Sequence, residues 1–183
     1  MTSMDNCFQN CSSLTSISLP SLPNVTYMGF CFRNCSSLTS VSLPELSNVT
    51  YMGSCFQGCI SLTSITLPSL PKVTNMQSCF YGCSSLTSIS LPELPKVTTM
   101  NLCFYNCTSL ETLTIGALNT ALSNLATCEL SYCTKLTVDS LVNVLNALPT
   151  RTGTNRLTIG TTNLDKLDAA QKAIATNKGW TLN

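Results

Sequence analysis

CFQNCSSLTSISLPSLPNVTYMGF, the stretch from Cys7 to Phe30, is followed by near copies of itself through the first two thirds of the chain. The copies begin at a constant spacing of 24 residues, at Cys31, Cys55, Cys79 and, for a fifth copy that soon diverges, Cys103. Repetition at this period is typical of a solenoid, in which each repeat forms one coil and buries its apolar face only against neighbouring coils. The sequence therefore predicts a solenoid over residues 1–115 and directs the search for function to a surface rather than to a pocket.

The composition limits the classes of partner. Only 9% of the 183 residues are charged and the net charge is +1, so nothing suggests electrostatic binding to nucleic acid or to an anionic membrane. The sequence also contains no run of about 18 apolar residues, the length that a membrane-spanning helix requires. We therefore expect neither nucleic-acid binding nor membrane insertion.

Each repeat predicts the same coil. Ile17 and Leu19 alternate with serines, which is typical of a short strand with one buried face, and the prolines that follow end it. We expect strands at 14–19, 38–43, 62–67, 86–91 and 110–115 to form one parallel sheet, and residues 7–11 to form a helical turn. The side chains expected to point inward, with their equivalents in every repeat, are Phe8, Cys11, Leu14, Ile17, Leu19, Val25 and Met28. The phenylalanines should stack in one column.

The repeated elements resemble the BspA-like class of leucine-rich repeats. The Phe-x-x-Cys, LxxIxLP and V-x-x-M elements recur in register over roughly residues 2–115. The resemblance implies an α/β leucine-rich-repeat solenoid with a parallel β-sheet and short turns or 3-10 segments on the return side. It also implies a bacterial surface protein that engages host or neighbouring macromolecules. One departure is the cysteine that opens each repeat, where the family usually has alanine.

Residues 116–183 depart from the repeat and are expected to form a helical capping region that is continuous with the solenoid. Residues 117–127 are predicted to be a helix or an irregular connector. Beyond them we predict a helix over 139–148, a strand over 156–160, a helix over 164–177 with Thr162 or Asn163 as N-cap, and a strand over 180–182. We expect these strands to continue the parallel sheet and the helices to cap its open end.

The chain has 12 cysteines and no histidine. Because the cysteines follow the repeat, they favour two ladders of buried thiols. Disulfides between adjacent coils and a zinc site built from two C-x3-C elements are the alternatives. A cysteine nucleophile paired with a histidine base is impossible without histidine. We expect no catalytic residue, no metal and no cofactor.

Two sets of surface residues are candidates for binding. Small hydroxyl side chains line the exposed face of the predicted sheet, in a column formed by Ser16, Ser40, Ser64, Ser88 and Thr112 and in a second column beside it. This array either solubilises the face or binds carbohydrate, a protein strand or ice. The second set occupies positions that vary between copies: Arg33, Tyr81 and Tyr105 at one, Tyr27 and Tyr51 at another. Tyrosine and arginine are common interface anchors, although drift at unconstrained positions explains the variation equally well.

These features predict a non-enzymatic scaffold that binds a protein or carbohydrate surface ligand. The alternative is a structural stalk, or a receptor-binding segment, of a phage tail or a larger surface protein. The chain begins in the middle of a repeat, so we expect it to be part of a longer protein, and the resemblance implies that this parent is extracellular or at the cell surface. The chain itself has no signal peptide. We expect a monomer that can associate end to end through its uncapped first coil.

Overall fold

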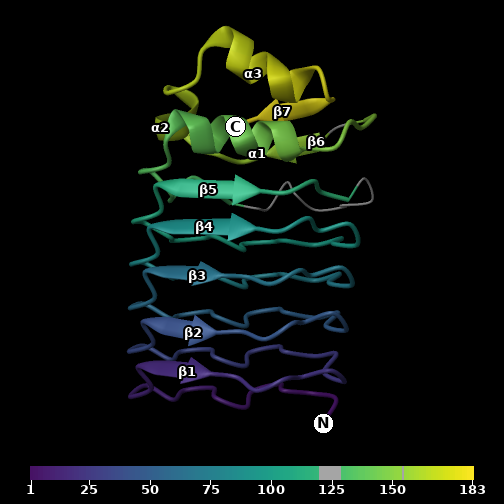
Figure 1. Cartoon of the computed structure of the whole chain (residues 1–183). Helices are drawn as coiled ribbons and strands as arrows, with labels where there is room; N and C mark the ends of the chain where they lie inside the picture. The colour runs from purple at the N-terminus through teal and green to yellow at the C-terminus, as the bar shows by residue number, and fades with distance from the viewer. Residues whose placement is uncertain (120–128, 154) are drawn as a thin grey trace.

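The structure, a computed structural model, describes residues 1–119, 129–153 and 155–183. Figure 1 shows a solenoid whose strands lie one above another, with the helical region at the C-terminal end. The strands are β1 (Ser16–Ser18), β2 (Ser40–Ser42), β3 (Ser64–Thr66), β4 (Ser88–Leu91) and β5 (Thr112–Ile115). The predicted repeat solenoid is confirmed, although each strand is shorter than predicted because the pairing begins two residues after its predicted start.

The strands pair in parallel and in the register of the repeat. Ser16 lies opposite Ser40, and Ser64 lies opposite Ser88, which in turn lies opposite Thr112. The expected single sheet is divided, however: β1 and β2 form one sheet, and β3, β4 and β5 form another. The coils nevertheless remain stacked across this division, because the return side of the coil is continuous there.

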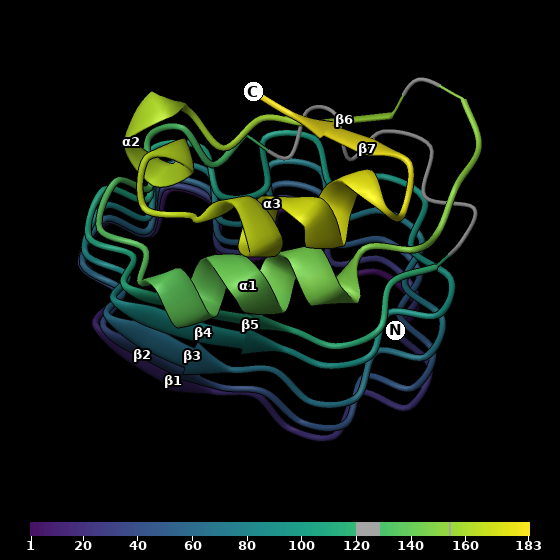
Figure 2. The same cartoon turned by 90° about the horizontal axis from the view of Figure 1, so that it is seen from above.

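The return side carries a second ladder. Parallel bridges join Ser3, Tyr27, Tyr51, Asn75 and Thr99, each to its equivalent in the next coil. Figure 2 shows the solenoid along its axis, with the strands on one long side and the return segments on the other. The threonines just before these bridges add side-chain bonds: the Thr50 hydroxyl donates to the Thr26 carbonyl at 3.1 Å, and the Thr74 hydroxyl donates to the Thr50 carbonyl at 3.1 Å. The coils are therefore held in register on this side by backbone and side chain together.

The predicted helical turn is a pair of tight turns. The Cys11 N–H donates to the Phe8 carbonyl at 3.1 Å, three residues earlier, and every following coil repeats this bond. The residue just before this cysteine adopts the left-handed backbone conformation. Its φ is 63° at Asn10 in the first coil and 74° at the equivalent Gly58 in the third. Asparagine and glycine adopt this conformation most readily, which explains why this position holds only Asn or Gly in the five copies.

The interior is built from stacked columns of identical side chains. The rings of Phe8, Phe32, Phe56, Phe80 and Phe104 lie nearly parallel, with neighbouring centroids 5.3–5.7 Å apart. The predicted inward-pointing residues are buried in the inner coils, except Val41 and Leu43, which are half-buried where the sheet divides. The first coil differs: Cys11 is exposed, and Phe8, Leu14 and Ile17 are only half-buried, because this coil has a neighbouring coil on one side only.

The helical region begins with α1 (Val138–Ala147), which lies over β5 in the place of a further strand (Figure 1). Thr137 caps its first turn, since the Thr137 hydroxyl accepts a hydrogen bond from the Ser140 N–H. Two side chains of α1 meet the open edge of the sheet. Ser140 Oγ accepts from the Leu113 N–H at 3.1 Å, and Asn143 Oδ1 accepts from the Ile115 N–H at 2.7 Å. Side chains of a helix thus replace the ladder that another strand would provide.

The predicted continuation of the sheet beyond β5 is wrong. β6 (Asn155–Leu157) and β7 (Trp180–Leu182) pair with each other in a separate parallel sheet. Figure 2 shows them on the side of the coil opposite β1–β5. The Leu130 N–H donates to the Thr158 carbonyl at 3.0 Å, so this pair stacks on the return side. The position above β5 is already occupied by α1.

The predicted helix over 164–177 is divided into α2 (Thr161–Leu164) and α3 (Ala169–Thr176). Asp168 starts α3 with a capping box, in which its side chain bonds the Gln171 N–H and the Gln171 side chain bonds the Asp168 N–H. Asn163, one of the predicted caps, is buried instead, and its amide donates to the carbonyls of Leu130, Cys133 and Ile159. The predicted segment 117–127 falls mostly outside the described residues.

Candidate binding surfaces

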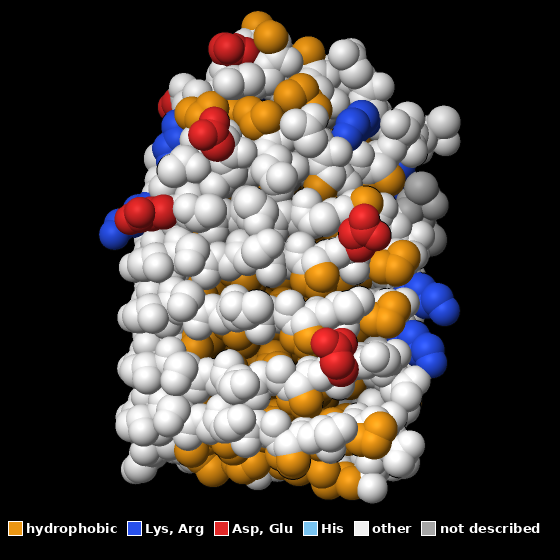
Figure 3. All heavy atoms as spheres, viewed as in Figure 1, with side chains coloured by type: hydrophobic (Ala, Val, Ile, Leu, Met, Phe, Trp, Pro, Cys, Tyr) orange, Lys and Arg blue, Asp and Glu red, His pale blue; other side chains and the backbone are white. Residues whose placement is uncertain are grey.

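The hydroxyl column predicted from the repeat forms the outer face of the strands. Ser16, Ser40, Ser64, Ser88 and Thr112 are all exposed, each opposite its equivalent wherever the strands pair. Figure 3, viewed as in Figure 1, shows that charged side chains are sparse on this side of the molecule. The face therefore offers regularly spaced hydroxyls with little charge.

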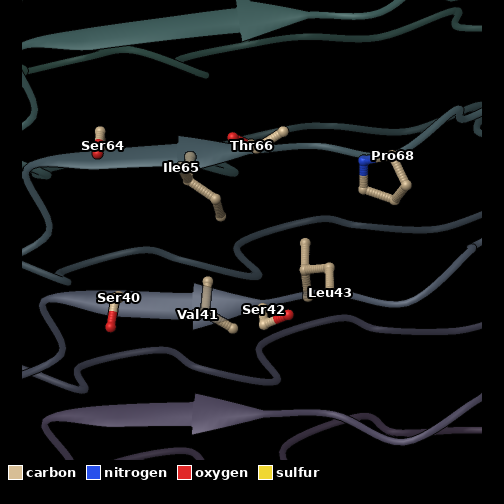
Figure 4. A pocket seen from close by; sticks show the side chains of 8 residues that line it. All are labelled: Ser40, Val41, Ser42, Leu43, Ser64, Ile65, Thr66 and Pro68. Atoms are coloured by element: carbon tan, nitrogen blue, oxygen red, sulfur yellow. The ribbon is translucent and has the colours of Figure 1, made fainter.

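An open hollow of about 490 Å³ interrupts this face where the sheet divides. Figure 4 shows its lining, which comes from β2, from β3 and from the segments just after them: Ser40, Val41, Ser42, Leu43, Ser64, Ile65, Thr66 and Pro68. Val41 is the smallest residue at its position, where the other copies have isoleucine or leucine. The lining holds no ionisable side chain. The hollow therefore offers backbone and hydroxyl groups to a ligand, with no acid or base for catalysis.

The other predicted residues lie on the return side and form two separate aromatic groups. Tyr81 and Tyr105 stack with ring centroids 5.0 Å apart and planes 13° apart. The Tyr132 ring packs against Tyr105 at a tilt, with centroids 4.6 Å apart and planes 51° apart, and it is 48% exposed. The hydrogen bond with Tyr132 raises the pKa of the Tyr105 phenol above its ordinary value. We call Tyr81, Tyr105 and Tyr132 the tyrosine column.

Sequence reasoning missed Tyr132. It lies beside Cys133, in a segment that matches the repeat at few positions. When Cys133 is aligned with Cys107, Tyr132 aligns with Asn106 and not with Tyr105. The cysteine spacing before it differs from that of the repeat. Only the folded path of residues 129–133 therefore brings the Tyr132 ring against Tyr105.

The second aromatic group lies nearer the N-terminus. The Tyr27 and Tyr51 rings are 6.3 Å apart with planes tilted by 39°, and the Arg33 guanidinium lies 5.6 Å from the Phe30 ring centroid. Tyr27, Phe30 and Tyr51 line an open hollow of about 280 Å³ together with Asp5 and Asn6. We call these five residues the aromatic hollow. Arg33, Tyr27 and Tyr51 are thus brought together, apart from Tyr81 and Tyr105.

The described cysteines form the two predicted ladders, and their thiols are buried except for those of Cys7 and Cys11 in the first coil. In the second ladder each S–H donates to the phenylalanine carbonyl of the preceding coil at 3.0–3.2 Å; its members are Cys35, Cys59, Cys83, Cys107 and Cys133. Burial raises the pKa of the Cys59 and Cys79 thiols to about 12. Thiols with so high a pKa are poor nucleophiles and poor metal ligands. Cys128 lies outside the described residues, and among the described ones no cluster could hold a metal ion.

Among the described residues, no helix has the length and apolar character needed to cross a membrane.

Comparisons with known proteins agree with this architecture. The family model of the BspA type leucine rich repeat region matches residues 2–140 in six copies. The solved structure of a T. pallidum leucine-rich repeat protein aligns with 100% of this chain and 79% of its own, at 23% identity and a TM-score of 0.68. No curated protein matches the chain. At this identity the solved structure shows the fold alone, while the family model covers most of the chain. The chain therefore belongs to the BspA type family of leucine-rich repeat proteins.

Proposed function

We propose that this chain is a non-enzymatic scaffold that binds a protein partner through the tyrosine column. The observation that carries the proposal is the contact of three tyrosine rings on the return side: Tyr81 stacks on Tyr105, and Tyr132, about half exposed, packs against Tyr105 at a tilt. Tyrosine presents a large, rigid and amphipathic surface, and it is enriched among the residues that dominate binding energies at protein interfaces. In this repeat, whose core residues are nearly identical in every copy, the surface position that holds Gln9, Arg33 and Gln57 becomes tyrosine at Tyr81 and Tyr105.

The rigidity of the solenoid supports binding. The tyrosine column is attached to coils that are joined by backbone hydrogen bonds, such as that from the Gly82 N–H to the Tyr105 carbonyl at 2.8 Å. The rings also restrain one another by stacking. Little conformational entropy is therefore left to lose when a partner covers them.

We propose that residues 116–183 cap the solenoid. Ser140 and Asn143 occupy the N–H groups at the edge of β5. The Lys178 ammonium donates to the carbonyls of Asn146 and Leu148 at 2.6 and 2.9 Å, so a positive charge lies at the C-terminal end of α1. An uncovered edge of β5 could pair with a strand of another molecule, and covering it with α1 prevents this kind of aggregation.

Membership of the family supports a place at a bacterial cell surface, or in a secreted protein, as part of a longer parent. The second candidate function is a structural stalk or a receptor-binding segment of a phage tail or surface protein. The uniform core favours a stalk, since the phenylalanine rings continue from coil to coil within 9° of parallel. A stalk requires no interface on the tyrosine column, and this difference can be tested.

The test compares the wild-type chain with Tyr81→Gln/Tyr105→Gln. Glutamine is the residue that the repeat itself carries in this column at Gln57, so the variant should fold normally. Both proteins are immobilised and exposed to purified extracellular host proteins and to a glycan array. We expect the wild type to bind a protein and the variant to bind it at least about tenfold more weakly. Equal binding by both proteins, or no binding by the wild type, would favour the stalk.

A further inference from the structure

The aromatic hollow is a second candidate site, and it does not depend on the tyrosine column. Its five lining residues include three aromatic side chains and one carboxylate, and no lysine or arginine. Its volume of about 280 Å³ lies just below the range of about 300–1,000 Å³ that is typical of sites for drug-sized ligands. The hollow therefore suits a small group rather than a whole macromolecular surface.

Neighbouring glycines make room for one of the rings. A Cβ atom added to Gly29 would lie 2.7 Å from the Tyr51 ring, so any other residue there would force the ring to shift. Gly53 likewise lies directly against the Tyr51 side chain. One face of this ring is therefore supported by backbone, which fixes its position.

The repeat pairs tyrosine with glycine in a consistent way. Where the bridging residue is Tyr27 or Tyr51, the residue two positions later is glycine. The next two copies have Asn75 followed by Gln77, and Thr99 followed by Asn101. The glycines thus accompany the rings and are not required by the coil itself. The aromatic hollow is a local feature of the first coils.

The chemistry of the lining favours a cation. Aromatic faces carry negative electrostatic potential and attract cations, more strongly when several rings share one site. The Asp5 carboxylate adds a full negative charge, and its Oδ1 is held by the Gly29 N–H at 2.7 Å. The Phe30 ring already receives the guanidinium of Arg33. A methylated ammonium fits best, because it is weakly hydrated and its methyl groups pack against rings.

We propose that the aromatic hollow binds a methylated ammonium group, such as that of choline or of trimethylated lysine. Tyr27, Phe30 and Tyr51 supply the ring faces and Asp5 supplies the counter-charge. The Arg33 guanidinium lies 5.6 Å from the Phe30 ring centroid and opposes a second cation there. Its removal should therefore strengthen binding, an effect that a neutral ligand would not show.

The probe is choline, titrated into the full chain and followed by NMR at the tyrosine ring protons. Its neutral isostere, 3,3-dimethyl-1-butanol, has the same shape without the charge, and methyl glucoside tests a sugar. We expect choline to shift the Tyr27 and Tyr51 signals and to bind at least about fivefold more tightly than the isostere. Phosphocholine and a trimethyl-lysine peptide then distinguish a lipid headgroup from a modified protein as the source.

The variants use residues that the repeat already tolerates. Tyr51→Asn copies Asn75, and it should weaken choline binding by at least about fivefold while far-UV circular dichroism stays unchanged. Asp5→Asn should weaken binding by at least about threefold, and Arg33→Gln should strengthen it by about twofold or more. Glu45→Gln removes an exposed charge elsewhere and should change nothing.

Three results would overturn the proposal. Equal affinity for choline and its isostere would mean a purely apolar hollow. Stronger binding of methyl glucoside would identify a sugar site. Absence of any shift at the tyrosine signals up to high millimolar choline would mean that no such site exists. None of these results bears on Tyr81 or Tyr105, so the proposed function would stand or fail separately.

Discussion

The thiol of Cys83 donates a hydrogen bond to the backbone carbonyl of Phe56 in the preceding coil, with sulfur and oxygen 3.1 Å apart. The same carbonyl also accepts the Cys59 N–H at 3.2 Å, so it closes a turn within its own coil and joins that coil to the next. Both residues are fully buried. A donor that is small and largely apolar suits this position, which explains why cysteine recurs there.

Thiol labelling should separate the first coil from the rest. Cys7 and Cys11 are exposed, whereas every other described cysteine is buried. We expect iodoacetamide to label Cys7 and Cys11 in the native protein and to reach Cys31–Cys107 only after unfolding. Peptide mapping by mass spectrometry measures this. Native labelling of Cys59 or Cys79 at a rate comparable to Cys11 would contradict the buried ladders.

Stability should fall in alkali. Burial raises the pKa of the Cys79 thiol from 9.0 to about 12, so folding favours its neutral form. This contribution is complete below pH 9, where the thiol is neutral in both states, and it is lost between about pH 9 and pH 12 as the unfolded chain ionises. Each such thiol should lower the free energy of unfolding by about 1.4 kcal/mol per pH unit in that range.

The variant Cys79→Ala isolates this effect from the titration of tyrosine and lysine. Urea unfolding at several pH values between 8 and 11 should give a shallower loss of stability for the variant than for the wild type. Identical pH dependence of the two proteins would show that the Cys79 thiol does not titrate differently in the folded state.

Removing the bond between Cys83 and Phe56 should be costly. Cys83→Ala loses the hydrogen bond and leaves a small cavity, and we expect a loss of about 1–2 kcal/mol in the free energy of unfolding. Cys11→Ala is the matched control, because Cys11 occupies the same repeat position but is exposed. It should change stability by less than about 0.5 kcal/mol. A similar loss for both variants would argue against a specific role of the buried thiol.

The division of the sheet should be visible in amide exchange. The Thr39 N–H donates to the Thr15 carbonyl at 2.8 Å and the Thr87 N–H donates to the Thr63 carbonyl at 2.9 Å. Among the described residues, the equivalent bond from Thr63 to Thr39 is absent. We expect the Thr63 amide to exchange at least about tenfold faster than those of Thr39 and Thr87. Equal protection would show that the ladder is continuous in solution.

The contact between α1 and β5 should stabilise the end of the sheet. Ser140→Ala removes the acceptor of the Leu113 N–H and the hydroxyl that donates to the Glu111 carbonyl at 3.0 Å. Leaving a buried N–H unpaired should cost about 1–3 kcal/mol of unfolding free energy, measured by urea denaturation. Ser88→Ala, on the exposed face of β4, should cost less than about 0.5 kcal/mol. Equal effects would mean that Ser140 does not pair the sheet edge.

The folded repeats could be predicted in detail from the sequence because stacking brings like residues together. Once the coils lie in register, Phe32 must face Phe56, and each thiol must face its equivalent. The exceptions are informative. Cys11 was expected inside, but burial at that position requires a neighbouring coil on both sides, which the first coil lacks. Among the surface candidates, Tyr27 and the hydroxyl column are exposed, whereas Arg33, Tyr51, Tyr81 and Tyr105 are half-buried. Their part in binding stays a proposal.

The region after the repeats was predicted less well because its pattern does not repeat. The helix 139–148 and the strand 180–182 follow from local signals; the helix is present one residue earlier, and the strand has the predicted bounds. The helix predicted over 164–177 is divided because Asp168 forms a capping box that competes with continuation. Asn163 was predicted as a helix cap, but its side-chain amide donates to the carbonyls of Leu130 and Cys133, about 30 residues earlier in the chain, and to that of Ile159.

The sequence by itself determined the period, the parallel strands, the aromatic and thiol columns and the family, since all of these follow from identical side chains at equal spacing. Only the tertiary structure decided where the sheet divides, that α1 takes the place of a sixth strand, and that Tyr132 joins Tyr105. It also decided that Gly29 and Gly53 both lie against the Tyr51 side chain, which lines the aromatic hollow. These features depend on contacts between coils that differ from one another, and a repeat pattern holds no information about such differences.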